Sequence, residues 1–381
     1  MKYIDEFRDG NLAREIAAAI HREIQPGRRY NLMEFCGGHT HAISRHGIED
    51  LLPASVRLIH GPGCPVCVLP VGRLQMAIDL ALTDDVILCS YGDMLRVPAH
   101  KEDSLLKARS RGADVRMIYS VDDALALARR HPERPVVFFA IGFETTTPPT
   151  AVAILQAARE GLKNFSVFCN HVLTPAAMLS ILESAVLQCG AVQLDGFVGP
   201  AHVSTVIGSR PYEFVASDYH HPVVIAGFEP LDMMQAILML IRQLNAGRAE
   251  VENEFTRAVG RDGNLKAQRL TAEVLTQRDS FEWRGLGSVP FSALKIRDEF
   301  ADFDAERRFA MEPRAIADHK ACECADVLRG LKHPRDCKVF ATACTPDNPL
   351  GSCMVSSEGA CAAHYLYGRF REAHRKTAGA V

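Results

Sequence analysis

Short runs of apolar residues alternate with longer amphipathic segments over the first two-thirds of the chain. The runs are rich in Val, Ile and Phe, which is typical of buried strands, and the segments between them repeat apolar positions at helical spacing. We predict strands at 30–35, 56–60, 85–90, 115–119, 135–143, 165–172, 195–199 and 221–228, and helices at 73–82, 122–130, 149–161, 175–186 and 230–244. Residues 249–277 are predicted to be helical as well.

Buried strands that alternate with helices indicate parallel sheets covered on both faces. Connections within α/β units are short, so two sheets of about four strands fit the length better than one sheet of eight. The predicted fold class is therefore α/β, with two similar parallel-sheet domains and a mainly helical and loop module at the C-terminus. The expected domains are an N-terminal helical segment packed on that module (1–28), the two α/β domains (29–130 and 131–250) and the C-terminal module (251–381).

Composition and charge narrow the class of protein. The chain has 381 residues, of which 48% are hydrophobic and 23% charged, and a formal net charge of −3. This balance shows no excess of positive charge of the kind that indicates nucleic-acid binding. No apolar run approaches the roughly 18–20 residues that span a membrane, and the charged N-terminus lacks a signal-peptide core. We expect a soluble, cytoplasmic protein.

Twelve cysteines are the unusual feature of the composition. Structural disulfides are disfavoured in a reducing cytosol, so clustered cysteines indicate metal or redox chemistry. Three lie in turns rich in Gly and Pro, three lie in apolar patterns and are predicted to pack in the core, and six crowd the last sixty residues. These groups are Cys36, Cys64 and Cys67; Cys89, Cys169 and Cys189; and Cys322, Cys324, Cys337, Cys344, Cys353 and Cys361.

Polar side chains that could take part in catalysis or bind a ligand recur where predicted strands end. In open parallel sheets, ligands bind at the carboxyl ends of the strands. One such histidine or carboxylate is more often a helix cap or a loop contact than a catalyst. Several thiols, imidazoles and carboxylates at the same end are harder to explain by packing, and together they predict a site that draws on Cys36, His39, His41, Asp93, Glu144, His171 and His202.

The stretch HGPGCPVCVLP, residues 60–70, allows three interpretations. Cys64 and Cys67 form half of a zinc site if Cys36 and a histidine supply the other ligands. They form a redox dithiol if the turn is accessible and lowers a thiol pKa. A cluster would need two more thiolates, and Cys36 alone is near in this region.

The C-terminal cysteines allow two interpretations. Six thiols within forty residues exceed the needs of one four-ligand site. Zinc and a [4Fe–4S] cluster both accept four cysteines, and spacing alone does not choose between them.

The motifs CGGHTH, HGPGCPVCVLP, GFETTTPPTA, GPAHVSTVIG, AGFEPLD, ENEF, EWRGLG and MVSSEGACAA occur in this order over nearly the whole chain. In them the chain resembles the HypD family, iron–sulfur proteins that assemble the active site of [NiFe]-hydrogenases. The resemblance implies two similar α/β domains, a cluster-bearing third module and one [4Fe–4S] cluster. The family's C-x12-C-x6-C-x16-C pattern matches Cys324, Cys337, Cys344 and Cys361, and leaves Cys322 and Cys353 outside it.

The resemblance also implies a role and partners. HypD proteins and a small HypC-type partner form the platform on which iron receives two cyanides and one carbon monoxide, as Fe(CN)2CO. HypE, loaded by HypF, delivers cyanide from a thiocyanate. Transferred to the matching positions of this chain, the resemblance implies that Cys36 is the iron ligand and that Cys64 and Cys67 are a redox pair at the iron site. It also implies acid–base or positioning roles for His39, His202 and Glu358.

Cyanide release from a thiocyanate takes two electrons, which a dithiol supplies as it becomes a disulfide, and a cluster could restore the dithiol one electron at a time. We therefore expect an assembly scaffold with redox chemistry rather than a conventional enzyme. The competing interpretations are a structural zinc protein with a binding role and a generic thiol–disulfide oxidoreductase.

Overall fold

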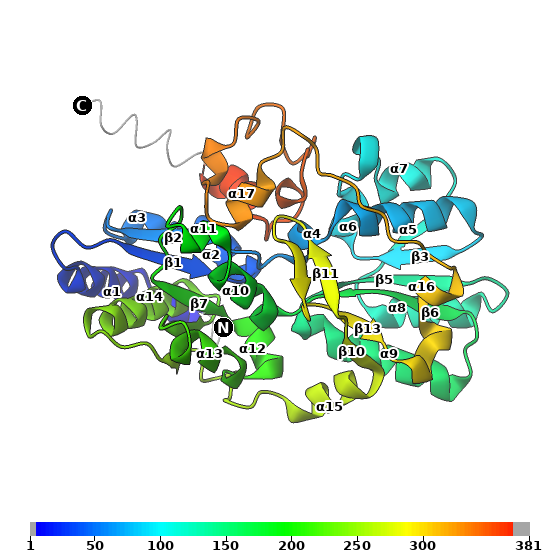
Figure 1. Ribbon diagram of the computed structural model, residues 1–381, viewed down its shortest axis with the longest axis horizontal. Coiled ribbons are helices and arrows are strands. Elements are labelled where there is room, and N and C mark those ends of the chain that lie inside the picture. The colour runs from blue at the N-terminus through cyan, green and yellow to red at the C-terminus, as the bar shows by residue number, and fades with distance from the viewer. Residues whose placement is uncertain (1–4, 369–381) are drawn as a thin grey trace.

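The computed structural model describes residues 5–368. Two parallel sheets lie side by side along the long axis, and the C-terminal cysteine segment lies above the junction between them (Figure 1). The α/β fold class with two parallel sheets is confirmed.

The first sheet has five strands in the order β2-β1-β7-β8-β9, and all neighbours are parallel. Every residue of β1 is buried, including the polar residues Asn31 and Glu34. The strands are β1 (Tyr30–Glu34), β2 (Val56–His60), β7 (Gly196–Pro200), β8 (Val223–Ala226) and β9 (Val251–Asn253).

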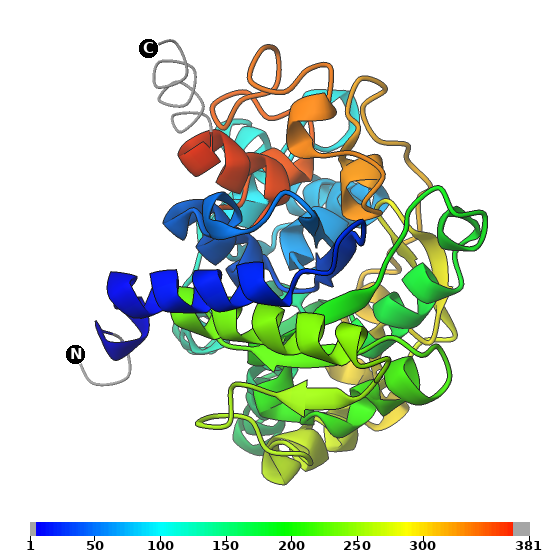
Figure 2. The same cartoon turned by 90° about the vertical axis from the view of Figure 1, so that its left-hand side faces the viewer.

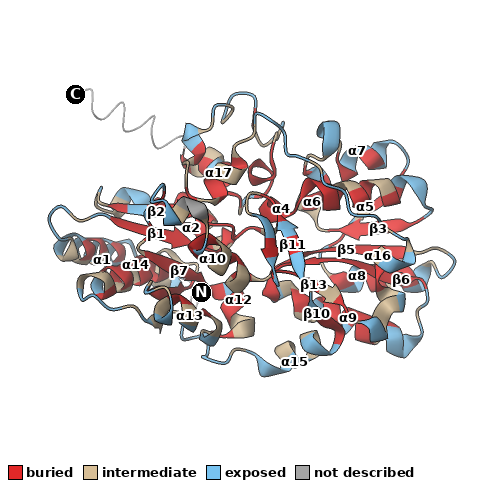
Figure 3. Cartoon of the chain, viewed as in Figure 1, coloured by how far each residue is buried: buried red, intermediate tan, exposed pale blue. Residues whose placement is uncertain are grey.

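The second sheet has four parallel strands in the order β4-β3-β5-β6. Strands β3, β5 and β6 are buried over their whole length, as the red strands of Figure 3 show. The strands are β3 (Ile87–Ser90), β4 (Asp114–Met117), β5 (Val136–Gly142) and β6 (Phe165–His171).

The expected boundary at 130/131 does not separate the two sheets. Strands β1 and β2 come from the predicted range 29–130, but β1 pairs with β7, and β7 and β8 come from 131–250. The four strands between them in sequence form the other sheet. Each sheet therefore combines both predicted ranges, because β1 pairs with a strand about 160 residues away.

Helices cover both faces of the five-stranded sheet. The N-terminal helix α1 (Gly10–Glu23) begins at Asp9, whose carboxylate accepts the N–H groups of Asn11 and Leu12. Figure 2 shows α1 alongside α14 (Pro230–Asn245). The other helices on this half are α2 (Gly37–His46), α3 (Ile48–Leu51), α10 (Thr174–Leu182), α11 (Ala185–Gln188), α12 (Ala201–Ile207) and α13 (Glu213–Ser217).

The prediction that the N-terminal helix packs on the C-terminal module is wrong. Its buried residues Ala17 and Ile20 belong to the same core as Met233 of α14. Glu23 reinforces this contact, because its carboxylate accepts a hydrogen bond from Arg242 at 2.9 Å. The apolar stripe of α1 thus faces α14, the helix with complementary apolar positions.

The helices on the four-stranded half include α8 (Val121–Arg130) and α9 (Thr147–Glu160), which pack on β5 and β6. The remaining ones are α5 (Val71–Thr83), α6 (Gly92–Arg96), α7 (Leu105–Ser110), α15 (Leu265–Val274) and α16 (Ala305–Arg308).

Residues 275–296 contain strands where helix and loop were expected. They form two antiparallel pairs, and the β11–β12 hairpin places Trp283 in the core at 1% exposure. The strands are β10 (Leu275–Gln277), β11 (Ser280–Trp283), β12 (Gly287–Pro290) and β13 (Leu294–Ile296), and the short helices α17 (Cys324–Leu328) and α18 (Ala360–Ala363) follow in the cysteine segment.

One hydrophobic cluster joins the three parts of the molecule. It contains Met33 of β1, Phe139 of β5 and Cys361 of the cysteine segment. The cysteine segment therefore shares a core with both sheets. None of the helices within residues 5–368 has the length and apolar character needed to cross a membrane.

Candidate functional site

Cys36 lies where β1 ends and α2 begins. Its backbone is extended, and its N–H donates to Glu34 Oε2 at 3.0 Å. Glu34 is fully buried and also accepts hydrogen bonds from the hydroxyl of Thr40 and, at 2.9 Å, from Nδ1 of His60. This one carboxylate therefore fixes the start of α2 to the end of β2, and with it the place of Cys36.

The Glu34–His60 pair is buried, and His60 is 6% exposed. Burial lowers the pKa of the His60 imidazole, but the hydrogen bond and charge of Glu34 outweigh burial, so the net pKa is raised. Glu34 therefore pairs with the His60 ring as well as orienting the Cys36 backbone.

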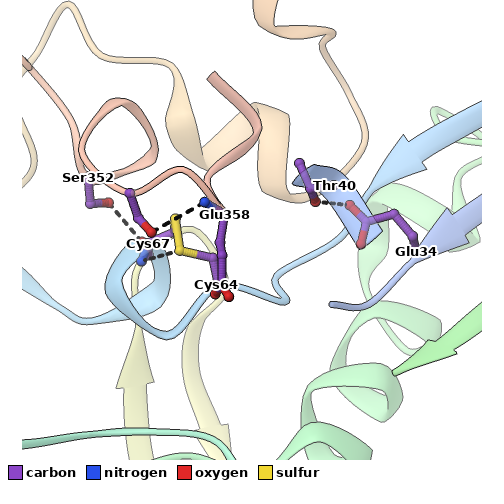
Figure 4. The surroundings of a disulfide bond; sticks show 7 residues. Glu34, Thr40, Cys64, Cys67, Ser352 and Glu358 are labelled. Atoms are coloured by element: carbon purple, nitrogen blue, oxygen red, sulfur yellow. Dashed lines mark hydrogen bonds between the residues drawn. A yellow bond between two sulfur atoms is a disulfide. The ribbon is translucent and has the colours of Figure 1, made fainter. Parts of the chain in front are cut away.

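Cys64 and Cys67 form a disulfide, with their Cα atoms 5.2 Å apart (Figure 4). Cys64 precedes the short helix α4 (Pro65–Val68), and its sulfur accepts the N–H of Cys67 at 3.2 Å. Pro65 at the first helical position favours this turn. Both residues are buried, at 3% and 0% exposure.

The disulfide turn lies against the backbone of Cys36. The N–H of Gly37 donates to the carbonyl of Gly63 at 3.1 Å. A Cβ atom on Gly63 would lie 2.4 Å from the nitrogen of Cys36, so only glycine permits this approach. The structure therefore brings together the two cysteine motifs that the sequence keeps almost thirty residues apart.

A cleft of about 510 Å³ opens at the carboxyl ends of both sheets. In each sheet the chain leaves neighbouring strands in opposite directions, from β1 and β7 in one and from β3 and β5 in the other. Such switch points are where open α/β sheets bind ligands. The cleft lies between the two switch points, and its lining includes Cys36, Gly63, Asp93, Thr146, His202 and Glu358.

His39 and His202 flank the ring of Phe228. The centroids of His39 and Phe228 are 5.2 Å apart, and those of His202 and Phe228 are 3.9 Å apart. His39 Nε2 bonds to the carbonyl of Ala226 at 2.8 Å, whereas its Nδ1 is buried without a hydrogen-bond partner. Burial lowers the pKa of both imidazoles, so both are neutral near pH 7.

Glu358 reaches the site from the C-terminal segment. It packs on Gly37, where an added Cβ would lie 2.5 Å from Cβ of Glu358. Burial and the nearby carboxylates Asp93 and Glu34 raise the pKa of Glu358. Burial, Glu358 and Glu34 in turn raise the pKa of the Cys36 thiol. A buried thiol among carboxylates is neutral by itself and is suited to a cation, which would favour the thiolate.

The C-terminal segment is joined to the disulfide turn. Ser352 donates its hydroxyl to the carbonyl of Cys67 at 2.9 Å, as Figure 4 shows. Arg96 of α6 donates to the carbonyl of Val355 at 2.9 Å. These bonds hold the cysteine segment against the cleft from two sides.

Several of the C-terminal thiols gather around Cys324. Side-chain hydrogen bonds to Cys324 raise the pKa of Cys322 and of Cys361, and burial adds to the rise. Burial also raises the pKa of Cys344, with smaller contributions from Cys322 and Cys324. Gly351 forms a cradle here, since an added Cβ would lie 2.2 Å from the sulfur of Cys322 and 2.8 Å from that of Cys324.

Cys337 stands apart from this group, with Glu323 as its side-chain partner. Among residues 5–368, no three or more Cys, His, Asp or Glu side chains are arranged as ready metal ligands. The thiol chemistry fits an iron–sulfur cluster, and three of the four predicted ligands adjoin one another. Cys89 and Cys169 are buried as predicted, whereas Cys189 is exposed, so the core placement predicted for it is wrong.

Sequence reasoning did not single out Glu34, Gly63 or Phe228. A signal existed for Glu34, because it is a lone carboxylate inside an apolar strand. Gly63 and Phe228 act through contacts between segments distant in sequence, which no local pattern reveals.

The fold and site define a class of protein in which two parallel sheets and a cysteine-rich segment enclose one cleft, with a thiol and a disulfide-bonded C-x-x-C turn at its edge. The family model HypD, described as the hydrogenase formation hypA family, matches residues 11–368. The chain belongs to the HypD family.

Relatives match over almost their full length. The hydrogenase expression/formation protein HupD of Azotobacter chroococcum is 69% identical over 98% of both chains. The hydrogenase maturation factor HypD of Cupriavidus necator is 66% identical over 98% of both chains. That of Escherichia coli is 44% identical over 96% of this chain and 98% of its own.

Proposed function

We propose that this protein is a hydrogenase maturation factor on which the Fe(CN)2CO group of [NiFe]-hydrogenases is assembled. The observation that carries the proposal is the close contact between Gly63 and the backbone of Cys36, because it brings the proposed iron ligand near the proposed redox pair, Cys64 and Cys67. The full-length similarity to hydrogenase maturation factors supports the same role.

Cys36 is the proposed ligand of the substrate iron. Its thiol is neutral among carboxylates, and iron binding would release its proton and turn the surrounding negative charge into a favourable interaction. Glu358 adjoins the thiol, and its raised pKa suits it to accept that proton. His39 and His202 are neutral and packed against Phe228; His202 lines the cleft and would position the ligands that arrive, with His39 supporting it through Phe228.

Cys64 and Cys67 are the proposed electron source. Cleaving the S–CN bond of a thiocyanate yields a thiolate and cyanide and takes up two electrons. The two cysteine thiolates supply both electrons as their S–S bond forms, so charge and atoms balance. The disulfide in the structure corresponds to the product side of this exchange.

The C-terminal cysteines are proposed to hold a [4Fe–4S] cluster through Cys324, Cys337, Cys344 and Cys361. When bound, such a cluster transfers single electrons from a low-potential donor, which suits the return of the disulfide to the dithiol. The protein's own contribution is to bury the thiols of Cys324, Cys344 and Cys361, to leave room at Gly351 and to tie the segment to Cys67 through Ser352. We propose a HypC-type protein and HypE as partners, with HypF upstream.

The burial of both disulfide sulfurs argues against a generic thiol–disulfide oxidoreductase, because exchange with unselected disulfides needs an accessible thiol. A structural zinc role for the disulfide turn is disfavoured by the bond between its two sulfurs.

Infrared spectroscopy of the anaerobically purified complex with a HypC-type protein tests the proposal. We expect cyanide and carbonyl bands, which Cys36→Ala should abolish while leaving the brown colour of the cluster. Cys189→Ala, which changes an exposed cysteine, is the matched control and should retain bands and colour. Full bands in Cys36→Ala would remove Cys36 as the iron ligand, and a colourless wild-type protein would remove the cluster.

A further inference from the structure

Arg284 carries a buried guanidinium at the turn of the β11–β12 hairpin. The residue is 4% exposed and directly follows the buried Trp283. Its backbone N–H donates to the carbonyl of Val68 at 2.8 Å, and the Nε1–H of Trp283 donates to Ser292 at 2.8 Å. These two bonds fix the turn, and with it the base of the Arg284 side chain.

The guanidinium of Arg284 has one charged neighbour and makes no hydrogen bond with any of the residues 5–368. Its Nε lies 3.0 Å from Oδ1 of Asp318, whose side chain is 40% exposed. This contact lacks the angles of a hydrogen bond, and the buried Nε has no other acceptor. A guanidinium carries five N–H donors, and buried donors in proteins are nearly always satisfied. The unmet donors therefore indicate a ligand that offers acceptor oxygens.

Arg284 lines a cavity of about 700 Å³, a common size for a small-molecule site. Lys101 and Lys320 line it as well, and neither lysine side chain has an ion pair or a hydrogen bond within the described part of the chain. The carboxylates of the lining are Glu102 and Asp318, so cations outnumber carboxylates by three to two. This excess of positive charge in a concave site favours an anion.

Apolar residues form much of the remaining lining of the cavity. They include Val71, Ile316 and Leu350, and the imidazoles of His100 and His319 add polar groups between them. Apolar walls with a few charged groups are typical of sites for organic ligands. The lining thus suits an anion that also has an apolar part.

One side of the cavity is formed by the turn His100–Glu102, whose backbone is strained. Lys101 and Glu102 have φ angles of 53° and 59°, in the left-handed region that residues other than glycine rarely adopt. A hydrogen bond from the N–H of Ala99 to the carbonyl of Asp103, at 2.7 Å, closes the turn. Backbone strain of this kind clusters at ligand sites, where it places particular side chains.

The opposite side of the cavity is formed by an extended segment, residues 315–320, between α16 and α17. Just before it, the chain crosses α5, where Arg314 pairs with Asp79 at 2.6 Å (Figure 1). Just after it, the N–H of Cys322 donates to the carbonyl of His319 at 2.8 Å. A ligand in the cavity would contact both this segment and the hairpin that carries Arg284.

We propose that this cavity binds a small organic anion. Its carboxylate or phosphate oxygens accept hydrogen bonds from Arg284, and its apolar part lies against Val71, Ile316 and Leu350. The planar guanidinium matches the geometry of both kinds of oxyanion. The cavity shares no lining residue with the cleft that contains Cys36, so the proposal does not depend on the proposed function.

Isothermal titration calorimetry of the full chain with benzoate, phenyl phosphate and benzamide tests the site. The three probes share a phenyl ring, and benzamide is the neutral analogue of benzoate. We expect at least one of the two anions to bind, and benzamide to bind at least about tenfold more weakly. Arg284→Gln should weaken binding of that anion at least about tenfold. Arg307→Gln, which removes an exposed guanidinium paired with Asp298, is the matched control and should leave the affinity unchanged.

Ala99→Phe gives a second arm that leaves Arg284 in place. Ala99 is a half-buried residue of the lining, so a phenyl ring there should fill the cavity and abolish binding. This arm remains informative if circular dichroism shows that Arg284→Gln does not fold. Limited digestion with trypsin reads out the same event, because Arg314 and Lys320 flank the extended segment. The bound anion should slow cleavage there in the wild type but not in Ala99→Phe.

Three outcomes would overturn the proposal: no binding of either anion, equal affinity for benzoate and benzamide, or wild-type affinity in folded Arg284→Gln or Ala99→Phe. Binding of benzoate alone or of phenyl phosphate alone would support the site and identify the charged group that it accepts.

Discussion

Glu34 shows how much of the site depends on single residues. Its carboxylate accepts hydrogen bonds from the Cys36 backbone, the Thr40 hydroxyl and the His60 ring. Because Glu34 is fully buried, each of these bonds forms without competition from water. The Glu34 carboxylate therefore organises the site from a buried position, although the residue proposed to act in the site is Cys36.

Gly63→Ala should separate the two cysteine motifs. The new Cβ would fall 2.4 Å from the nitrogen of Cys36, so the disulfide turn must move away, at a cost of about 1–3 kcal/mol in the free energy of unfolding. We expect hydrogenase maturation in a complemented deletion strain to fall at least about tenfold. Gly260→Ala, whose Cβ would meet nothing within 4 Å, is the control. Wild-type maturation by Gly63→Ala would show that the close approach is dispensable.

His171 should make the fold sensitive to acid. Its ring is fully buried between Thr146 and Thr150, and burial lowers its pKa to about 4. Between pH 6.5 and 4, His171 binds a proton in the unfolded chain but not in the folded protein, so the free energy of unfolding decreases as the pH falls. The effect is on the order of 3 kcal/mol.

Urea unfolding of His171→Gln at pH 7.5 and pH 4.5 measures this contribution. The variant is less stable at pH 7.5, because the threonine hydroxyls lose their partner. The difference from wild type should shrink at pH 4.5, since the variant has no ring to keep neutral. A difference that stays constant with pH would assign the acid sensitivity to other groups.

At the scale of elements, the turn that holds Cys64 and Cys67 should survive loss of its disulfide. The turn is also fixed by Pro65, by the bond from Gly37 to Gly63 and by the bond from Ser352 to Cys67. We therefore expect Cys64→Ser and Cys67→Ser to fold, retain cluster colour and bind the HypC-type partner, yet to block maturation. The double variant should be no worse than either single one, because the two residues act as a unit.

Complementation of a deletion strain and anaerobic thiol titration check this expectation. Cys189→Ser changes an exposed cysteine and serves as the control. Normal hydrogenase maturation by Cys67→Ser would show that the two cysteines have only a structural role.

The eight strands predicted from apolar runs all occur, because most of them are buried on both faces and are therefore largely apolar. Strand β9 was missed within a range read as helical. It has three residues, Val251–Asn253, only partly buried at the sheet edge, so it has no apolar run to detect. Within the same range, helix α15 is present as predicted.

At the scale of the whole molecule, the pattern of apolar residues could not show which strands pair. It places Cys36, Asp93 and His202 at the ends of strands, and all three line the cleft. It does not show that β1 pairs with β7, because nothing in a buried strand of this length encodes its neighbour. The contact between α1 and α14 was missed for the same reason.

The paired ranges predict that residues 1–130 cannot fold alone. In that fragment β1 lacks β7 and β3 lacks β5, so both sheets lose a central neighbour. Circular dichroism and urea titration should show no cooperative transition, whereas the full chain should unfold cooperatively. A cooperative unfolding transition in the fragment would support a domain boundary at 130/131.

The pairing of β1 with β7 has a consequence for synthesis on the ribosome. About 160 residues separate the two strands, so at cellular elongation rates β1 waits roughly 10–30 s for its neighbour. During that interval the segments that carry Cys36, Cys64 and Cys67 are outside the ribosome but not yet enclosed by the finished cleft. Newly made chains are therefore most vulnerable to oxidants, and most dependent on molecular chaperones, before residue 200 has emerged.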